Sequence, residues 1–222
     1  MSATPERNMA RIAVIAKVLT TPFVRYELHG QEYVADTHVG IIAANHRSFF
    51  DVPAGLIALH HFKRYPRLLV ASPYFERRAT RRLVRSIGAI PVDRERKSGT
   101  AASAAVEALQ EGVPILVMPE GRLHWDPGDP LTTGPTRPGV SRLAVAADVP
   151  VVPVAISGTE TVWPASKRLP RFNPFRRKTV VIRLSGSLLH FQSDDHEANT
   201  GEVMAHIRAL LAVSAGVPPE GA

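Results

Sequence analysis

A histidine and an aspartate stand five positions apart, directly after a run of apolar residues. His46 and Asp51 follow the apolar run 39–44, and the two side chains can meet if the chain turns from strand into helix between them. The carboxylate would then hold one imidazole tautomer and stabilise its charged form, leaving the other ring nitrogen to take a proton. The pair is therefore a candidate general base.

The spacing alone is weak support, because it occurs three times in the chain. His124 and Asp129 repeat it, as do His190 and Asp195. Only His46 follows a predicted interior strand, at the end where open α/β sheets bind their ligands. The alternative is a structural histidine that hydrogen-bonds to backbone at the end of a strand.

Two further groups of residues could hold a polar or phosphorylated substrate. Arg94 comes six residues after Gly88, in a stretch (residues 61–100) with eleven Lys and Arg against three Asp and Glu. It could clamp a phosphate or be an ordinary solvated arginine. Glu120, Gly121 and Arg122 follow an apolar run and could bind hydroxyl and phosphate groups where glycine allows close approach; otherwise they form a turn that ends a strand.

These side chains would be positioned by alternating strands and helices. Continuous apolar runs predict strands buried on both faces, at 39–44, 68–71, 89–92, 113–118 and 151–156. Residues 179–185 predict a late strand. The stretches between and after them predict helices at 52–62, 74–87, 99–111, 139–147 and 198–213. The alternation predicts an α/β fold, with a mainly parallel central sheet flanked by helices. Pro153, inside one run, favours an edge, a bulge or a bend there.

Residues 7–21 predict a separate N-terminal amphipathic helix. Arg7, Arg11 and Lys17 share one side, and most of the apolar residues cover the other. The helix could lie in a membrane interface or pack on the domain. We therefore divide the chain into residues 1–30, the helix and possible anchor, and 31–222, the catalytic domain. No membrane span or signal peptide is expected.

Composition narrows the classes of function. The 222 residues contain no cysteine, which excludes disulfides, cysteine nucleophiles and cysteine-ligated metals. The formal net charge is +7, and residues 163–183 hold seven basic residues and no acidic one. Such patches predict an anionic partner, such as a phosphorylated metabolite, a lipid surface or a nucleic acid.

Four motifs together resemble a known family. The chain reads Asn-His-x-x-x-x-Asp at 45–51, Gly-x-x-x-x-x-Arg at 88–94, Pro-Glu-Gly at 119–121 and Val-Pro-Val around residue 153. In order and separation these resemble the four blocks of the glycerolipid acyltransferases, which include the 1-acylglycerol-3-phosphate and related lysophospholipid acyltransferases. The resemblance covers about residues 30–200. It departs in the third block, where Met118 replaces a usual Phe and Arg122 follows the glycine without a Thr.

The resemblance implies a role for each matching residue. His46 would be the general base and Asp51 would orient it. Arg94, Glu120 and Gly121 would hold the phosphate and glycerol portion of the acceptor, with Arg122 beside them in the same block. Pro153 would belong to the acyl-donor side or to the structure.

The implied reaction is O-acyl transfer from acyl-CoA or acyl-ACP to the free hydroxyl of a lysophospholipid, with 1-acylglycerol-3-phosphate as the leading acceptor. It requires no cofactor beyond this co-substrate, no metal and no covalent acyl-enzyme, and Ser48 has no feature favouring it as a nucleophile. We expect a cytoplasmic protein, peripheral on the inner face of the cell membrane and in contact with anionic lipid, with no nucleic acid partner. The alternatives are a glycolipid or specialised-metabolite acyltransferase, a thioesterase or lipid hydrolase with the same His–Asp pair, and a non-enzymatic nucleic-acid binder.

Overall fold

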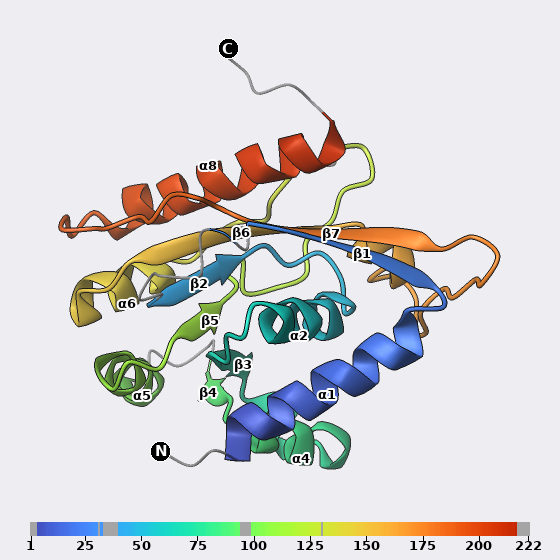
Figure 1. Cartoon of the computed structure of the whole chain (residues 1–222). Coiled ribbons are helices and arrows are strands. Elements are labelled where there is room, and N and C mark those ends of the chain that lie inside the picture. Colours follow the sequence, from blue (N-terminus) through green and yellow to red (C-terminus); the bar gives the residue numbers. More distant parts are fainter. Residues whose placement is uncertain (1–3, 31, 33–39, 94–98, 130, 217–222) are drawn as a thin grey trace.

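In the part of the chain that the structure describes, seven strands form one sheet (Figure 1). The computed structural model describes residues 4–30, 32, 40–93, 99–129 and 131–216. The strands are β1 (Val24–His29), β2 (Ile41–Ala44), β3 (Arg67–Ala71), β4 (Ile90–Val92), β5 (Ile115–Val117), β6 (Val151–Ser157) and β7 (Lys178–Leu184). Their order is β1-β7-β6-β2-β5-β3-β4, and β6 and β7 are antiparallel while the other neighbours are parallel. The predicted α/β fold with a mainly parallel sheet is confirmed.

Helices cover both faces of the sheet (Figure 1). They are α1 (Thr4–Thr20), α2 (Asp51–His61), α3 (Pro73–Glu76), α4 (Arg78–Ser86), α5 (Gly99–Gln110), α6 (Gly139–Ala147), α7 (Thr159–Val162) and α8 (His196–Ala215). On one face α2 packs against the sheet, and α1 packs against the outer side of α2. On the other face α5, α6 and α8 cover the sheet. The layers leave the carboxyl ends of the central strands as the place where loops gather.

The central strand β2 shows why its sequence is continuously apolar. All four of its residues are buried. Ile41 and Ala43 enter the core beneath α5, α6 and α8, whereas Ile42 and Ala44 enter the core beneath α2. Because successive side chains point to opposite faces, a strand covered on both sides needs apolar residues at every position.

Two elements differ from the prediction. The strand β1 was not predicted, although it alternates apolar and polar residues, as a strand with one covered face does. It pairs with β7, so the sheet begins before residue 31, where we placed the start of the catalytic domain. The single helix predicted at 74–87 is two helices, because Arg77 has extended backbone angles between α3 and α4.

The N-terminal helix α1 packs on the domain and also leaves apolar residues exposed. Met9 and Ala13 are buried against the core around α2. Ile15 and Leu19 of the same helix are exposed. Among the described residues, no helix combines the length and the apolar character needed to cross a membrane.

Candidate active site

The site begins where β2 ends. The Asn45 side chain donates to the Ile156 carbonyl oxygen at 2.9 Å, and its Oδ1 accepts from the Ile156 amide at 2.8 Å. This pair of bonds joins β2 to β6 one residue past the strand end and fixes the direction in which the chain leaves the sheet. His46 follows at once, and Asp51 is the first residue of α2.

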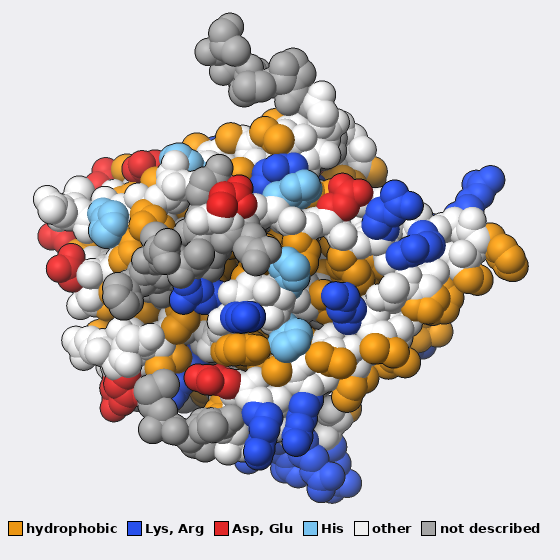
Figure 2. All heavy atoms as spheres, viewed as in Figure 1, with side chains coloured by type: hydrophobic (Ala, Val, Ile, Leu, Met, Phe, Trp, Pro, Cys, Tyr) orange, Lys and Arg blue, Asp and Glu red, His pale blue; other side chains and the backbone are white. Residues whose placement is uncertain are grey.

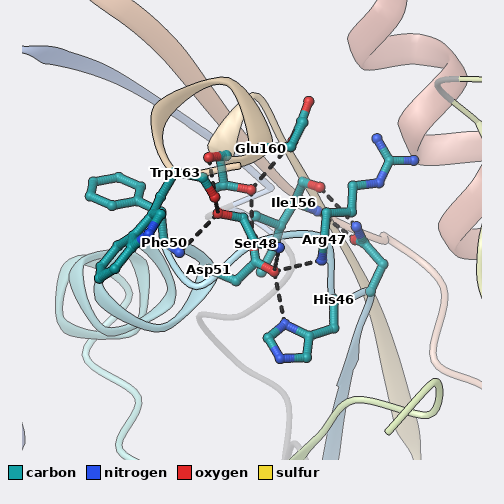
Figure 3. A network of polar contacts seen from close by, with 10 residues as sticks. His46, Arg47, Ser48, Phe50, Asp51, Ile156, Glu160 and Trp163 are labelled. Carbon is teal, nitrogen blue, oxygen red and sulfur yellow. Dashed lines mark hydrogen bonds and ion pairs between the residues drawn. The ribbon is translucent and has the colours of Figure 1, made fainter. Parts of the chain in front are cut away.

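The structure brings His46 and Asp51 together (Figure 3). His46 Nδ1 lies 2.8 Å from Asp51 Oδ2. The same oxygen accepts from the backbone amides of Arg47 at 2.7 Å and Ser48 at 2.8 Å. Asp51 is completely buried, whereas the His46 side chain is 19% exposed. A carboxylate held by two amides favours the imidazole tautomer with its proton on Nδ1, which leaves Nε2 free to accept a proton from a substrate.

The other two His-x-x-x-x-Asp matches form no such pair among the described residues. Asp129 Oδ1 accepts from the amide of Leu131 in a turn. Asp195 Oδ1 accepts from the amide of Ala198 and caps the start of α8. Both carboxylates accept hydrogen bonds from nearby backbone amides. The position of His46 at the end of a strand, and not the spacing of the two residues, therefore distinguishes the first match from the other two.

Thr159 holds the second oxygen of Asp51. Its hydroxyl donates to Asp51 Oδ1 at 2.5 Å, and both residues are completely buried. Thr159 reaches this place because the chain turns sharply at Gly158, whose φ is +83°. A Cβ at Gly158 would collide with the Thr179 carbonyl group, so only glycine fits. We did not predict Thr159; the only sequence signal was its position directly after the fourth motif and a glycine.

Arg47 is a second residue that the sequence analysis missed. It is only 2% exposed, and its guanidinium lies 4.9 Å from the centre of the Trp125 ring and donates to the Thr132 carbonyl oxygen. Burial lowers its pKa, while the nearby carboxylates, Glu160 and Glu120 foremost, act in the opposite direction. The buried cation balances acidic groups that surround the His–Asp pair.

Glu120 lies in the same buried cluster. It is 5% exposed, and neither carboxylate oxygen makes a well-formed hydrogen bond with a described residue. Burial raises the pKa of Glu120 to about 7, although the backbone amides near it and the Arg47 charge work against the shift. A carboxyl group with this pKa is partly protonated at neutral pH, so it can donate to or accept from a substrate hydroxyl.

The other predicted binding residues are placed differently. Gly121 has a φ of +64° in a tight turn, where its amide donates to the Met118 carbonyl oxygen. Arg122 is exposed and stands outside the buried cluster. Arg94 lies outside the described residues.

The loop that carries Glu120 is tied directly to the histidine. The amide of His124 donates to the His46 carbonyl oxygen at 2.8 Å, and the amide of Arg137 donates to the Pro119 carbonyl oxygen at 3.0 Å. The second bond joins the two ends of this loop, and the first holds the loop against the end of β2. The third motif is thereby held beside the first.

Ser48 has a structural role. Its hydroxyl donates to the carbonyl oxygen of Trp163 at 2.6 Å or of Thr159 at 3.0 Å, and it accepts from the amide of Phe50 at 2.9 Å. The side chain is completely buried. A hydroxyl occupied in this way fastens the start of α2 to the segment after β6, and it is not placed to act as a nucleophile.

A small apolar cavity of about 40 Å³ lies between α2 and the sheet. Its lining is apolar apart from Arg64 and comes from the buried face of α2 and from four central strands. At Gly55, in the first half of α2, an added Cβ would meet no atom within 4 Å. The described residues contain no group of three or more His, Cys, Asp or Glu that could bind a metal ion.

Comparison with known proteins gives a family match and matches to solved structures. A family model described as acyltransferase matches residues 25–157, more than half of the chain. No curated protein sequence matches this chain. The crystal structure of the 1-acyl-sn-glycerophosphate (LPA) acyltransferase PlsC from Thermotoga maritima is similar, with a TM-score of 0.74 and 20% identity over 96% of this chain and 81% of that chain. The two proteins share a fold.

Proposed function

The chain belongs to the acyltransferase family, and from this premise we propose that it transfers a fatty acyl group from acyl-CoA or acyl-ACP to the free hydroxyl of a lysophospholipid. The His46–Asp51 contact of 2.8 Å at the end of β2 is the observation that carries the proposal. The motif resemblance and the Thermotoga maritima neighbour, described as an LPA acyltransferase, favour 1-acylglycerol-3-phosphate as the acceptor.

In the proposed mechanism His46 acts as the general base. Its Nε2 takes the proton of the acceptor hydroxyl while the hydroxyl oxygen attacks the thioester carbonyl carbon. The carbon–sulfur bond then breaks, and the leaving thiolate takes the proton back from the imidazolium. Asp51 stabilises the imidazolium during this exchange. General-base assistance of this kind contributes about 100- to 10,000-fold to the rate.

Acceptor binding is assigned to the third motif and to Arg94. Glu120 would hydrogen-bond a glycerol hydroxyl, because its position beside His46 and its pKa near 7 suit an exchangeable partner. Gly121, which has no side chain, would let the acceptor approach the backbone next to Glu120. Arg94 would hold the phosphate, as the resemblance implies. Arg122, exposed at the surface, would contact the headgroup only from outside the buried cluster.

The small apolar cavity between α2 and the sheet is the place that we assign to part of the acyl chain. An apolar lining favours a hydrocarbon over water. The helix α2 lines the cavity and starts at Asp51, the partner of the proposed base His46. Filling it tests this assignment: Gly55→Leu should shift preference from long to short acyl donors, whereas Gly55→Ala should not. Equal preference in all three proteins would contradict it.

The reaction itself is tested by product analysis. Labelled palmitoyl-CoA or palmitoyl-ACP is mixed with 1-acylglycerol-3-phosphate, with a lysoglycolipid, or with no acceptor, and the lipids are separated. We expect labelled phosphatidic acid. Label in the glycolipid alone would change the acceptor, and free fatty acid alone would show a hydrolase. Because such acceptors reside in bilayers, we also place the protein at the inner face of the cell membrane.

A further inference from the structure

The segment between α7 and β7 exposes large apolar side chains. We name residues 164–177 the rim loop. Phe175 is 94% exposed and Leu169 is 75% exposed. Single exposed apolar residues are common, but two of this size on one loop leave much apolar surface in water. Neither side chain contributes to the core or to the candidate site.

The rim loop joins a second exposed apolar surface, the outer face of α1. This face carries Val14, Ile15, Val18 and Leu19, all of them exposed. The rings of Phe172 and Phe23 stack with their centres 4.8 Å apart, and Arg177 Nη2 donates to the Val24 carbonyl oxygen at 3.1 Å. The loop is therefore fastened where α1 leads into β1. Figure 2 shows hydrophobic side chains along the edge of the molecule where these two segments lie.

Basic residues accompany the apolar ones. The rim loop contains five, Lys167, Arg168, Arg171, Arg176 and Arg177, and no acidic residue. The outer side of α1 adds Arg11 and Lys17, both exposed. Apolar side chains surrounded by cations match the interface of an anionic bilayer, which offers acyl chains below a layer of negative headgroups. A polynucleotide would use the cations but would offer no apolar phase to Leu169, Val18 and Leu19.

The rim loop also leads to the candidate site. Trp163, directly before it, packs near Phe49 with ring centres 5.7 Å apart, and its carbonyl oxygen accepts from the Ser48 hydroxyl. Phe172 makes an edge contact with Phe50, whose ring centre lies 6.3 Å away. Phe49 and Phe50 stand between His46 and Asp51 in the sequence. These contacts connect the rim loop to the start of α2.

We propose that the rim loop inserts Leu169 and Phe175 into an anionic bilayer beside α1 and holds the candidate site close to the membrane. The lipid acceptor that would enter there rests on the proposed function. Binding to the bilayer does not rest on it, because the exposed side chains and the charge make that contact without any reaction.

Insertion is tested with a single environment-sensitive dye. The chain has no cysteine, so Phe175→Cys carries the only label, and Gln110→Cys on α5 is the matched control. We expect dye fluorescence to rise severalfold at position 175 with phosphatidylglycerol vesicles, to stay unchanged at position 110, and to stay low at both positions with phosphatidylcholine vesicles. Equal responses to both vesicle types, or a response to polynucleotide in place of vesicles, would overturn the proposal.

Removal of the apolar side chains gives an independent measurement. Leu169→Ser with Phe175→Ser should weaken flotation with phosphatidylglycerol vesicles by about tenfold or more. Val213→Ser, which changes an exposed residue of α8, should not. Transfer to a short-chain, monomeric acceptor should remain within about twofold of the wild-type rate for both. Unchanged flotation of the double variant would overturn the rim loop's role, whereas vesicle binding without any acyl transfer would contradict only the proposed function.

Discussion

The candidate site differs from the rim surface in how its side chains are held. The rim surface comprises the rim loop and the outer face of α1. In the site, Asp51 and Thr159 are completely buried and hydrogen-bonded to each other. On the rim, Phe175 lies almost wholly in solvent. A proton acceptor needs one fixed orientation, which burial and hydrogen bonds supply. A membrane contact needs no fixed partner, because its energy comes from moving apolar surface out of water. Substitutions in the two regions should therefore affect different measurements.

The largest effect is expected from Asp51→Asn. The amide can no longer stabilise an imidazolium, and it favours the wrong histidine tautomer. We expect the rate of acyl transfer to fall about 100- to 10,000-fold, with vesicle binding unchanged, as measured by initial rates and by flotation.

Asp195→Asn is the matched control, because it belongs to another His-x-x-x-x-Asp match and Asn also caps helices well. Its rate should equal that of the wild type. A comparable loss in both variants would show that the His46–Asp51 contact has no special role.

A smaller effect is expected from Thr159→Val. The change removes the donor to Asp51 Oδ1 inside a completely buried site, and it should lower the free energy of unfolding by about 1–3 kcal/mol. We expect the transfer rate to fall about tenfold through a lower kcat with little change in KM, since Thr159 acts by positioning Asp51. Thr159→Ser should restore both quantities, and a Ser variant as slow as Val would contradict the role of the hydroxyl.

Glu120→Gln should change stability in a pH-dependent way. The pKa of Glu120 is raised to about 7 in the folded protein, above the ordinary value of 4.5. Between these values the folded chain keeps a proton that the unfolded chain has released, so the wild-type free energy of unfolding falls as pH rises. The variant should gain roughly 3 kcal/mol on the wild type from pH 4.5 to pH 8. Urea unfolding across this range measures the difference, and a pH-independent difference would contradict the assignment.

The smallest effect is expected from one rim charge. Arg168→Ser should weaken binding to anionic vesicles about fivefold, since one cation near such a surface contributes about 1 kcal/mol. Transfer to a monomeric acceptor should stay at the wild-type rate. Flotation at several salt concentrations measures it, and the difference between the two proteins should vanish at high salt. A difference that persists there would contradict an electrostatic contribution.

The parts of the fold that were predicted correctly depend on local pattern. The strand β2 and helix α6 follow from apolar runs and helical spacing within one segment. Pro153 favoured an edge, a bulge or a bend, yet β6 lies between β7 and β2. The carbonyl oxygen of Pro153 accepts from the Ser185 amide, just beyond the end of β7. The amide hydrogen that proline lacks would therefore point to the place where the β6–β7 hydrogen bonds stop. No local signal could reveal that position.

The candidate site shows the same division. His46, Asp51 and Glu120 were predicted because they occur in motifs. Thr159 and Arg47 were missed because they contact residues that are distant in the sequence. Thr159 and Asp51, for example, are 108 residues apart. Burial also could not be predicted from the motifs. Glu120 and Arg122 are two residues apart, yet Glu120 is buried and Arg122 is exposed.

The most direct test of the central claim is thiol release from a long-chain acyl-CoA, followed with a thiol reagent. The protein contributes no background because it has no cysteine. Wild type and His46→Ala are compared with and without 1-acylglycerol-3-phosphate. We predict release that requires the acceptor and disappears in the variant. Release by the wild type without acceptor, or equal release by both proteins, would contradict the assignment of His46 as the base of an acyl transfer.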